Sequence, residues 1–129
     1  MMSLFASIDG RTMAGLMVLS LLSGCATADT FHAPGIEVAS TSTHAYQCEG
    51  GKSLTVTYWN SQAGQSFALL PVDGKPMLFV DTIAASGVKY MAGRYTWWTK
   101  GERGDLYDAM AGANAAPIIA GCMASATTK

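Results

Sequence analysis

The chain has 129 residues, a formal net charge of −1 and an isoelectric point near 6.0, and half of its residues are hydrophobic. This length fits a single domain. The charge balance lacks the basic excess that phosphate backbones require, so we exclude nucleic acid as a partner.

The N-terminal residues predict an export signal. Residues 13–22 form an apolar run that follows Arg11 and is too short for a stable membrane-spanning helix. The run leads into the sequence Leu-Ser-Gly-Cys, which ends at Cys25 and closely resembles the lipobox of bacterial lipoproteins. In those proteins the cysteine becomes the lipid-modified first residue. We therefore expect residues 1–24 to be a lipoprotein signal peptide and Cys25 to carry palmitate. An ordinary signal peptide or a buried N-terminal helix are the alternatives.

The residues after Cys25 suggest a location and a tether. Ala26 stands where the aspartate of the inner-membrane retention rule would be, which favours an outer-membrane lipoprotein that faces the periplasm of a Gram-negative envelope. Residues 25–43 show no sustained periodicity and are rich in small polar residues, so we expect a lipidated N-terminus and a flexible tether. Such a segment reaches roughly 20–25 Å. The folded domain is then expected over residues 44–129.

The number of cysteines is odd. If Cys25 carries lipid, Cys48 and Cys122 remain as one pair in an oxidising compartment. A disulfide between them would close a long loop and contribute roughly 4–5 kcal/mol in the chain-entropy model. Two free buried thiols are the alternative.

From His44 onward the pattern is that of short strands separated by turns. Residues 53–59 alternate apolar and polar side chains with the period of a half-buried strand. Asp73 and Gly74 predict a type I′ hairpin turn. Further strands are expected at residues 66–70, 77–81, 89–92, 95–98, 106–110 and 118–123, and a charged turn at residues 100–104. Seven or eight short strands indicate an antiparallel sandwich or a closed barrel.

No catalytic site emerges from the sequence. Ser86 and Lys89 match the Ser-x-x-Lys element of penicillin-binding proteins and β-lactamases, but the further motifs of those enzymes are absent. Residues three apart on an extended segment also point to opposite faces. His32 and His44 lack metal-site spacing, and the carboxylates do not single out a pair. We predict no enzymatic activity, no metal and no cofactor.

The region from residue 86 to residue 103 carries a local excess of positive charge. Its charged residues are Lys89, Arg94, Lys100, Glu102 and Arg103. Such a cluster would complement an acidic pocket on a partner, and a solvated face is the alternative. The neighbouring Trp97 and Trp98 face opposite sides of a strand, so one of them is expected in the core. Trp59 and Trp97 would be the stacking residues of a carbohydrate-binding protein.

An ordered set of motifs resembles the membrane-bound inhibitors of c-type lysozyme and their periplasmic relatives. The motifs lie at residues 46–51, 54–58, 85–90 and 98–101, with Leu106 and Cys122 completing the set. The resemblance covers about residues 46–122. It implies a small antiparallel β-barrel closed by one disulfide, and c-type lysozyme as the protein partner.

The resemblance also implies which residues act. The family inserts a serine and a lysine into the lysozyme cleft, and by motif these are Ser86 and Lys100, with Gly87, Tyr90 and Trp98 as further binding residues. Tyr90 and Trp98 could equally belong to the core. A cell-wall or carbohydrate-binding lipoprotein and a structural envelope lipoprotein stay open as other functions, and a homodimer stays open as the assembly.

Overall fold

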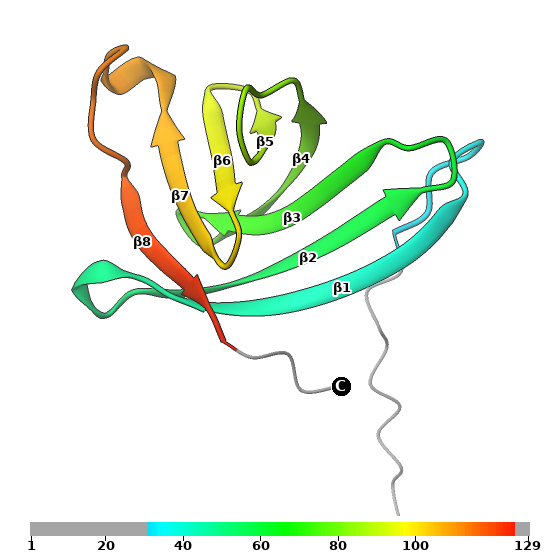
Figure 1. Cartoon of the computed structure of the whole chain (residues 1–129), viewed down its shortest axis with the longest axis horizontal. Coiled ribbons are helices and arrows are strands. Elements are labelled where there is room, and N and C mark those ends of the chain that lie inside the picture. The colour runs from blue at the N-terminus through cyan, green and yellow to red at the C-terminus, as the bar shows by residue number, and fades with distance from the viewer. Residues whose placement is uncertain (1–30, 126–129) are drawn as a thin grey trace, which may run out of the picture. The chain divides into compact units, whose positions relative to one another are not determined.

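The structure is a computed structural model that describes residues 31–125. Within this part of the chain, eight strands form a closed antiparallel barrel in which each strand pairs with the next and β8 returns to β1 (Figure 1). The predicted all-β barrel is therefore confirmed. The elements are β1 (Val38–Gln47), η1 (Glu49–Gly51), β2 (Ser53–Ser61), β3 (Ser66–Val72), β4 (Lys75–Thr82), β5 (Val88–Ala92), β6 (Tyr95–Lys100), β7 (Arg103–Asp108), η2 (Ala109–Ala111) and β8 (Ile119–Ala124).

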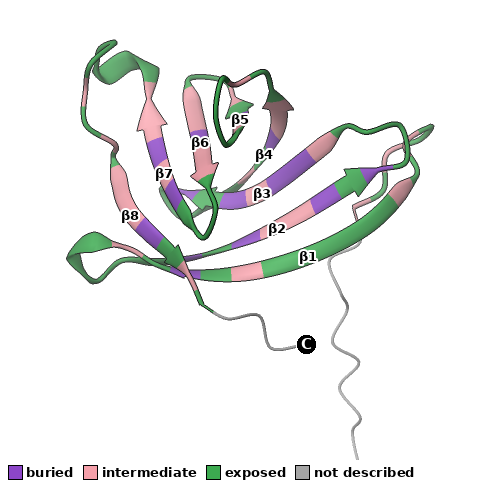
Figure 2. Cartoon of the chain, viewed as in Figure 1, coloured by how far each residue is buried: buried purple, intermediate pink, exposed green. Residues whose placement is uncertain are grey.

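The strands follow the period-2 pattern of the sequence. In β2, Leu54 and Val56 are buried while Thr55 between them is exposed, and in β7 the buried Gly104 and Leu106 flank the half-buried Asp105. Figure 2 shows buried segments separated by less buried ones along these strands. Successive side chains of a strand point to opposite faces, so one set fills the interior. The core consists of Tyr46, Leu54, Val56, Ala68, Leu70, Val72, Phe79, Tyr90, Trp97, Leu106 and Cys122.

Two tight turns set the registers of their hairpins. Asp73 and Gly74 have φ values of 50° and 74°, the positive pair that a type I′ turn needs, so the predicted hairpin is confirmed. The β6–β7 turn is shorter than the predicted 100–104, because Lys100 and Arg103 still pair across the two strands. Only residues 101 and 102 turn the chain there.

Trp97 is the largest fully buried side chain of the core. Its ring lies against Gly104, where an added Cβ would overlap the indole. The Trp97 Nε1–H donates to the Tyr58 hydroxyl at 2.8 Å, and the hydroxyls of Tyr58 and Tyr46 are 2.8 Å apart. Gly104 therefore provides the space for the indole, and the tyrosines satisfy its polar atom.

The barrel is closed by a short pairing and a covalent bond. β1 and β8 pair through Tyr46 with Ala124 and Gln47 with Met123. Directly beside these pairs, Cys48 and Cys122 form a disulfide across a sequence separation of 74 residues. The predicted disulfide is confirmed, and the alternative of two free thiols is excluded.

Residues 31–43 differ from the flexible tether predicted for residues 25–43. The compact unit begins at Phe31, and β1 begins at Val38 instead of His44. Polar β-branched side chains suit the exposed face of a strand, and the hydroxyls of Thr43 and Thr57 lie 3.1 Å apart across β1 and β2. The polar composition of residues 38–43 therefore marks an exposed strand face and was wrongly assigned to a tether.

The segment of residues 31–37, which we call the arm, is attached to the barrel surface. The Phe31 ring stacks on Trp59 and lies against Phe67, at centroid distances of 5.1 and 5.3 Å. The Glu37 carbonyl accepts a hydrogen bond from the Gln62 N–H at 2.9 Å. Trp59 and Phe67 are buried but do not belong to the core cluster. The arm thus covers a second, smaller aromatic cluster.

The predicted signal peptide and Cys25 lie outside the described residues. Among residues 31–125, no helix has the length and apolar character needed to cross a membrane.

Candidate functional site

The barrel places Ser86 and Lys100 on neighbouring turns. Ser86 lies on the loop of residues 83–87 between β4 and β5, and Lys100 ends β6 beside the β6–β7 turn. Val88, the first residue after the loop, pairs with Thr99, the residue before Lys100. Both Ser86 and Lys100 are exposed. Two segments separated in sequence thus present a hydroxyl and an ammonium at the same end of the β5–β6 hairpin.

Gly87 lets the loop rest on the end of β6. It has a φ of +64°, a conformation that other residues adopt at a cost. A Cβ at this position would collide with the Thr99 carbonyl and lie 2.8 Å from Cγ of Lys100. The loop backbone therefore packs directly against the stem of Lys100, which only glycine permits. This assigns Gly87 a positioning role.

Trp98 connects the two turns. Its Nε1–H donates to the Ser86 carbonyl at 2.9 Å. Nζ of Lys100 lies 4.4 Å from the centre of the Trp98 ring, and Nζ of Lys89 lies 4.1 Å from it. Ammonium groups at these distances are attracted to the indole face. One side chain on the outer face of β6 thus fixes the Ser86 loop and holds Lys100 close to it.

Lys89 and Ser86 contact different parts of Trp98. Lys89 pairs with Trp98 across β5 and β6, and its ammonium rests on the indole. The Ser86 backbone is held by Trp98 and not by Lys89. The two residues of the Ser-x-x-Lys sequence therefore do not form the serine–lysine arrangement of those enzymes.

Tyr90 belongs to the core. Only 7% of its surface is exposed, and it pairs with Trp97 inside the barrel. Burial raises the pKa of its hydroxyl, and the charge of Asp81 adds to this effect. Of the two residues left open between binding and core, Tyr90 therefore packs inside and Trp98 lies outside.

Trp59 and Trp97 cannot act as stacking platforms for sugars. Their exposed fractions are 4% and 0%, because Phe31 covers the first and the barrel encloses the second. A carbohydrate ring needs an open aromatic face. The sequence-based alternative that used these two residues is wrong.

The positive cluster divides into paired arginines and unpaired lysines. Arg94 binds Asp108 at 2.8 Å, and Arg103 binds Asp105 at 3.1 Å. In the part of the chain that the structure describes, Lys89 and Lys100 form no ion pair within 4.0 Å. The positive charge left for a partner therefore concentrates around Trp98.

Asp105 is fixed from two sides. Burial raises the pKa of its carboxyl, but hydrogen bonds from Arg103 and from the Gly121 N–H outweigh burial, aided by the charges of Arg103 and Lys100. The resulting pKa lies below its ordinary value. The Gly121 N–H donates at 2.7 Å, so this carboxylate links β7 to β8. Asp105 therefore neutralises Arg103. In the described part of the chain, the cation without such a partner beside the β6–β7 turn is Lys100.

A polar pocket at the barrel mouth was missed by sequence reasoning. It has a volume of about 230 Å³ and is lined by ten residues that include His44, Tyr46, Tyr58, Thr99 and Glu102. Burial is the main cause that raises the pKa of Tyr46 and of Tyr58. The alternation in β2 carried a signal for this pocket, because Tyr58 shares the parity of the inward Leu54 and Val56.

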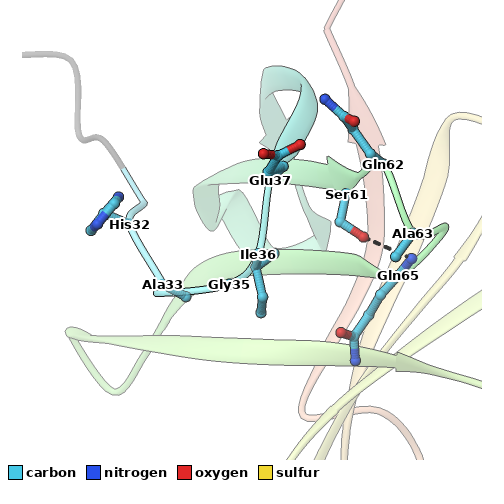
Figure 3. A pocket seen from close by; sticks show the side chains of 9 residues that line it. All are labelled: His32, Ala33, Gly35, Ile36, Glu37, Ser61, Gln62, Ala63 and Gln65. Carbon is cyan, nitrogen blue, oxygen red and sulfur yellow. Dashed lines mark hydrogen bonds between the residues drawn. The ribbon is translucent and has the colours of Figure 1, made fainter.

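A second pocket, of about 450 Å³, lies between the arm and the β2–β3 turn. Figure 3 shows that its side chains do not converge on a common point, and the hydrogen bond drawn there is the turn contact from the Gln65 N–H to the Ser61 hydroxyl at 3.0 Å. His32 lines this pocket, whereas His44 lines the barrel mouth. Among residues 31–125, no group of three or more His, Cys, Asp or Glu could hold a metal ion.

Comparisons with known proteins match this barrel and its motifs. The sequence model of the family described as membrane-bound lysozyme-inhibitor of c-type lysozyme (MliC) matches residues 46–115, more than half of the chain. Two relatives carry the name membrane-bound lysozyme inhibitor of C-type lysozyme. The one from Cupriavidus necator is 50% identical over 110 residues, which cover 83% of this chain and 87% of the relative. The one from Pseudomonas aeruginosa is 43% identical over 83 residues, 64% of this chain and 65% of the relative.

A solved structure shares the fold. The crystal structure of Pseudomonas aeruginosa MliC in complex with hen egg white lysozyme matches with a TM-score of 0.58 and 38% identity, covering 78% of this chain and 98% of that chain. The residues that the family model matches include Ser86, Gly87, Trp98 and Lys100. The chain therefore belongs to the family of membrane-bound lysozyme inhibitors of c-type lysozyme.

Proposed function

We propose that this protein inhibits c-type lysozyme by inserting Ser86 and Lys100 into the substrate cleft, and so protects the bacterial cell wall from host defence. The observation that carries the proposal is the bracing of the two turns by Trp98, which bonds the Ser86 backbone and holds Lys100. A braced pair of exposed polar groups is preorganised for a partner and loses little entropy on binding. The family to which the chain belongs supports the identity of the partner.

The chemistry of the two groups fits a lysozyme cleft. C-type lysozyme uses one protonated carboxylic acid and one ionised carboxylate on either side of the scissile bond. The ammonium of Lys100 would complement the ionised carboxylate. The hydroxyl of Ser86 donates and accepts, so it suits a site whose two carboxyls differ in protonation.

The net contribution of the lysine is smaller than its gross attraction. An ion pair at 4 Å gains about 4 kcal/mol at an effective dielectric constant of 20, and desolvation of both charges offsets part of this gain. Lys100 also leaves the Trp98 ring, whose cation–π contact contributes about 0.5–1 kcal/mol at an exposed position. Shape complementarity of the two turns therefore contributes a large share of the affinity.

The test measures how the purified full-length protein, in mild detergent, inhibits c-type lysozyme. The rate at which lysozyme clears a bacterial suspension gives the inhibition. We expect Lys100→Ala to weaken binding by about 2–5 kcal/mol, as expected when one partner of a buried charge pair is removed. Lys89→Ala is the comparison variant, because Lys89 contacts the same indole from the neighbouring strand but is not one of the two inserted residues. It should weaken binding much less than Lys100→Ala does.

Two outcomes would contradict the proposal at different levels. Normal inhibition by the double variant Ser86→Ala/Lys100→Ala would overturn the mechanism. A folded wild-type protein that neither binds nor inhibits c-type lysozyme would overturn the function. Its sedimentation with peptidoglycan in the absence of lysozyme would then favour a cell-wall lipoprotein.

We also propose that Cys25 is lipidated and anchors the protein at the outer membrane, facing the periplasm. The lipobox sequence and the membrane-bound description of the family support this location. Because the arm begins at Phe31, five residues separate Cys25 from the barrel unit, and the six steps from Cys25 to Phe31 span about 22 Å at most. If Cys25 is lipidated, labelling with palmitate should mark the wild type and should be lost in Cys25→Ala.

A further inference from the structure

Ile83, on the Ser86 loop, is the feature that neither the barrel nor the proposed Ser86–Lys100 pair explains. Its side chain is 95% exposed, whereas the other exposed large hydrophobic side chains among residues 31–125 range from 39% to 75%. The next residue, Ala84, is half-buried. The loop thus covers its small methyl group and leaves its large apolar side chain in water, which is the reverse of what burial alone favours.

The loop that carries Ile83 is held at both ends. Thr82 pairs with Lys89 at its base, and Val88 pairs with Thr99. In between, the Ser86 carbonyl accepts the Trp98 hydrogen bond, and Gly87 packs on β6. Isoleucine is β-branched and stiff at χ1, so little conformational freedom remains to be lost when a partner covers it.

The position of Ile83 lies inside any interface centred on Ser86. Ser86 comes three positions after Ile83, so their Cα atoms are at most about 11 Å apart. An interface of standard size buries about 800 Å² on each partner, which corresponds to a radius of about 16 Å. A standard-size interface centred on Ser86 therefore reaches the loop position of Ile83.

We propose that Ile83 is an apolar anchor that binds the substrate-cleft wall of c-type lysozyme beside the polar Ser86 and Lys100. This inference rests on the proposed function and adds the chemistry of the contact. The general acid of c-type lysozyme lies in apolar surroundings, which keep it protonated. A loop that brings a hydroxyl and an apolar side chain together matches a cleft with both kinds of surface.

The test is a substitution series at Ile83, with binding to hen egg white lysozyme measured by calorimetry on the full-length protein. Complete burial of an isoleucine predicts that Ile83→Ser weakens binding about 10- to 100-fold, and that Ile83→Val, which removes one methylene, weakens it about fourfold. The matched control is Met110→Ser, because Met110 is 75% exposed on η2, which follows the opposite end of β7. It should change the affinity less than twofold.

Salt distinguishes the apolar anchor from the charged group. The effect of Ile83→Ser should persist when the salt concentration is raised, whereas the effect of Lys100→Ala should shrink as charges are screened. Because Ile83 makes no contribution to the core, the melting temperature of each Ile83 variant should equal that of the wild type.

The failure of this inference differs from the failure of the proposed function. If the wild type binds lysozyme and Lys100→Ala weakens it, but Ile83→Ser stays within twofold, the apolar anchor is overturned and the inhibitor function stands. An equal loss in Met110→Ser would also overturn it, since the effect would then be unspecific. If the wild type does not bind lysozyme, both proposals are overturned.

Discussion

Trp97 and Trp98 are neighbours in sequence and serve opposite sides of the same strand. Trp97 is fully buried and donates its N–H to Tyr58 inside the barrel. Trp98 lies on the outer face and donates its N–H to the Ser86 carbonyl, with two lysines against its ring. Each indole satisfies its polar atom and packs its ring, but the first connects strands of the core and the second connects the turns of the proposed site.

The comparison indicates that stability and binding reside on different faces of one sheet. Side chains on the inner face of β6 share the core with other strands, so their loss weakens the whole barrel. Side chains on the outer face contact the loop of residues 83–87, so their loss changes the local shape of the site. Substitutions at the two tryptophans should therefore separate unfolding from inhibition.

The largest expected effect is a loss of stability from substitutions on the inner face of β6. Trp97→Ala should lower the free energy of unfolding by about 3–5 kcal/mol, because it leaves a cavity in the core and removes the donor to Tyr58. Gly104→Ala should also destabilise strongly, because the added methyl group would overlap the Trp97 ring. Urea denaturation gives the measurement. A Trp97→Ala protein as stable as the wild type would mean that the barrel interior is not a packed core.

A smaller effect, on lysozyme inhibition, is expected from a substitution on the outer face of β6. Trp98→Phe keeps an aromatic ring but removes the N–H that binds the Ser86 carbonyl, so lysozyme inhibition should weaken by about 1 kcal/mol, roughly fivefold. Its unfolding free energy should stay near that of the wild type. Trp97→Phe is the matched variant and should show the opposite pattern. If both variants lose stability to the same extent, the separation between the two faces is wrong.

The smallest expected effect is a pH dependence of the free energy of unfolding. It concerns only side chains inside the barrel. Burial raises the pKa of Tyr46, Tyr58 and Tyr90 above the usual value near 10, so the folded state favours their neutral forms. The stability that these groups contribute is complete below about pH 10 and declines at higher pH, because the unfolded tyrosines ionise first. Unfolding measured between pH 8 and pH 11 should show this decline. Tyr58→Phe should flatten it, whereas an unchanged slope would contradict the burial of that hydroxyl.

Much of the fold was predictable because strands carry their period in the sequence. The alternation in β2, the Asp73–Gly74 turn and the opposite faces of Trp97 and Trp98 all follow from local geometry. The start of β1 and the burial of Trp59 could not be predicted in this way, because both depend on residues that are distant in the sequence. Phe31 covers Trp59 from 28 positions away in the sequence, and no local pattern encodes such a contact.

The candidate site was predictable only in part. Ser86 and Lys100 came from the resemblance, since no periodicity brings a loop serine and a strand-end lysine together. Their proximity depends on the register of β5 against β6 and on the missing Cβ of Gly87. The role of Trp98 as the connection between them required the three-dimensional structure.

The pairing of β1 with β8 is much shorter than the pairing of β1 with β2. β1 pairs with β2 over nine residues, but the pairing with β8 spans only two, and the Cys48–Cys122 bond lies directly beside it. Apart from these two pairs, the backbone bond from the Ser125 N–H to the Ala45 carbonyl also joins the two ends. The disulfide adds a covalent link to this short seam, and a closed seam leaves no free strand edge that could pair with another chain.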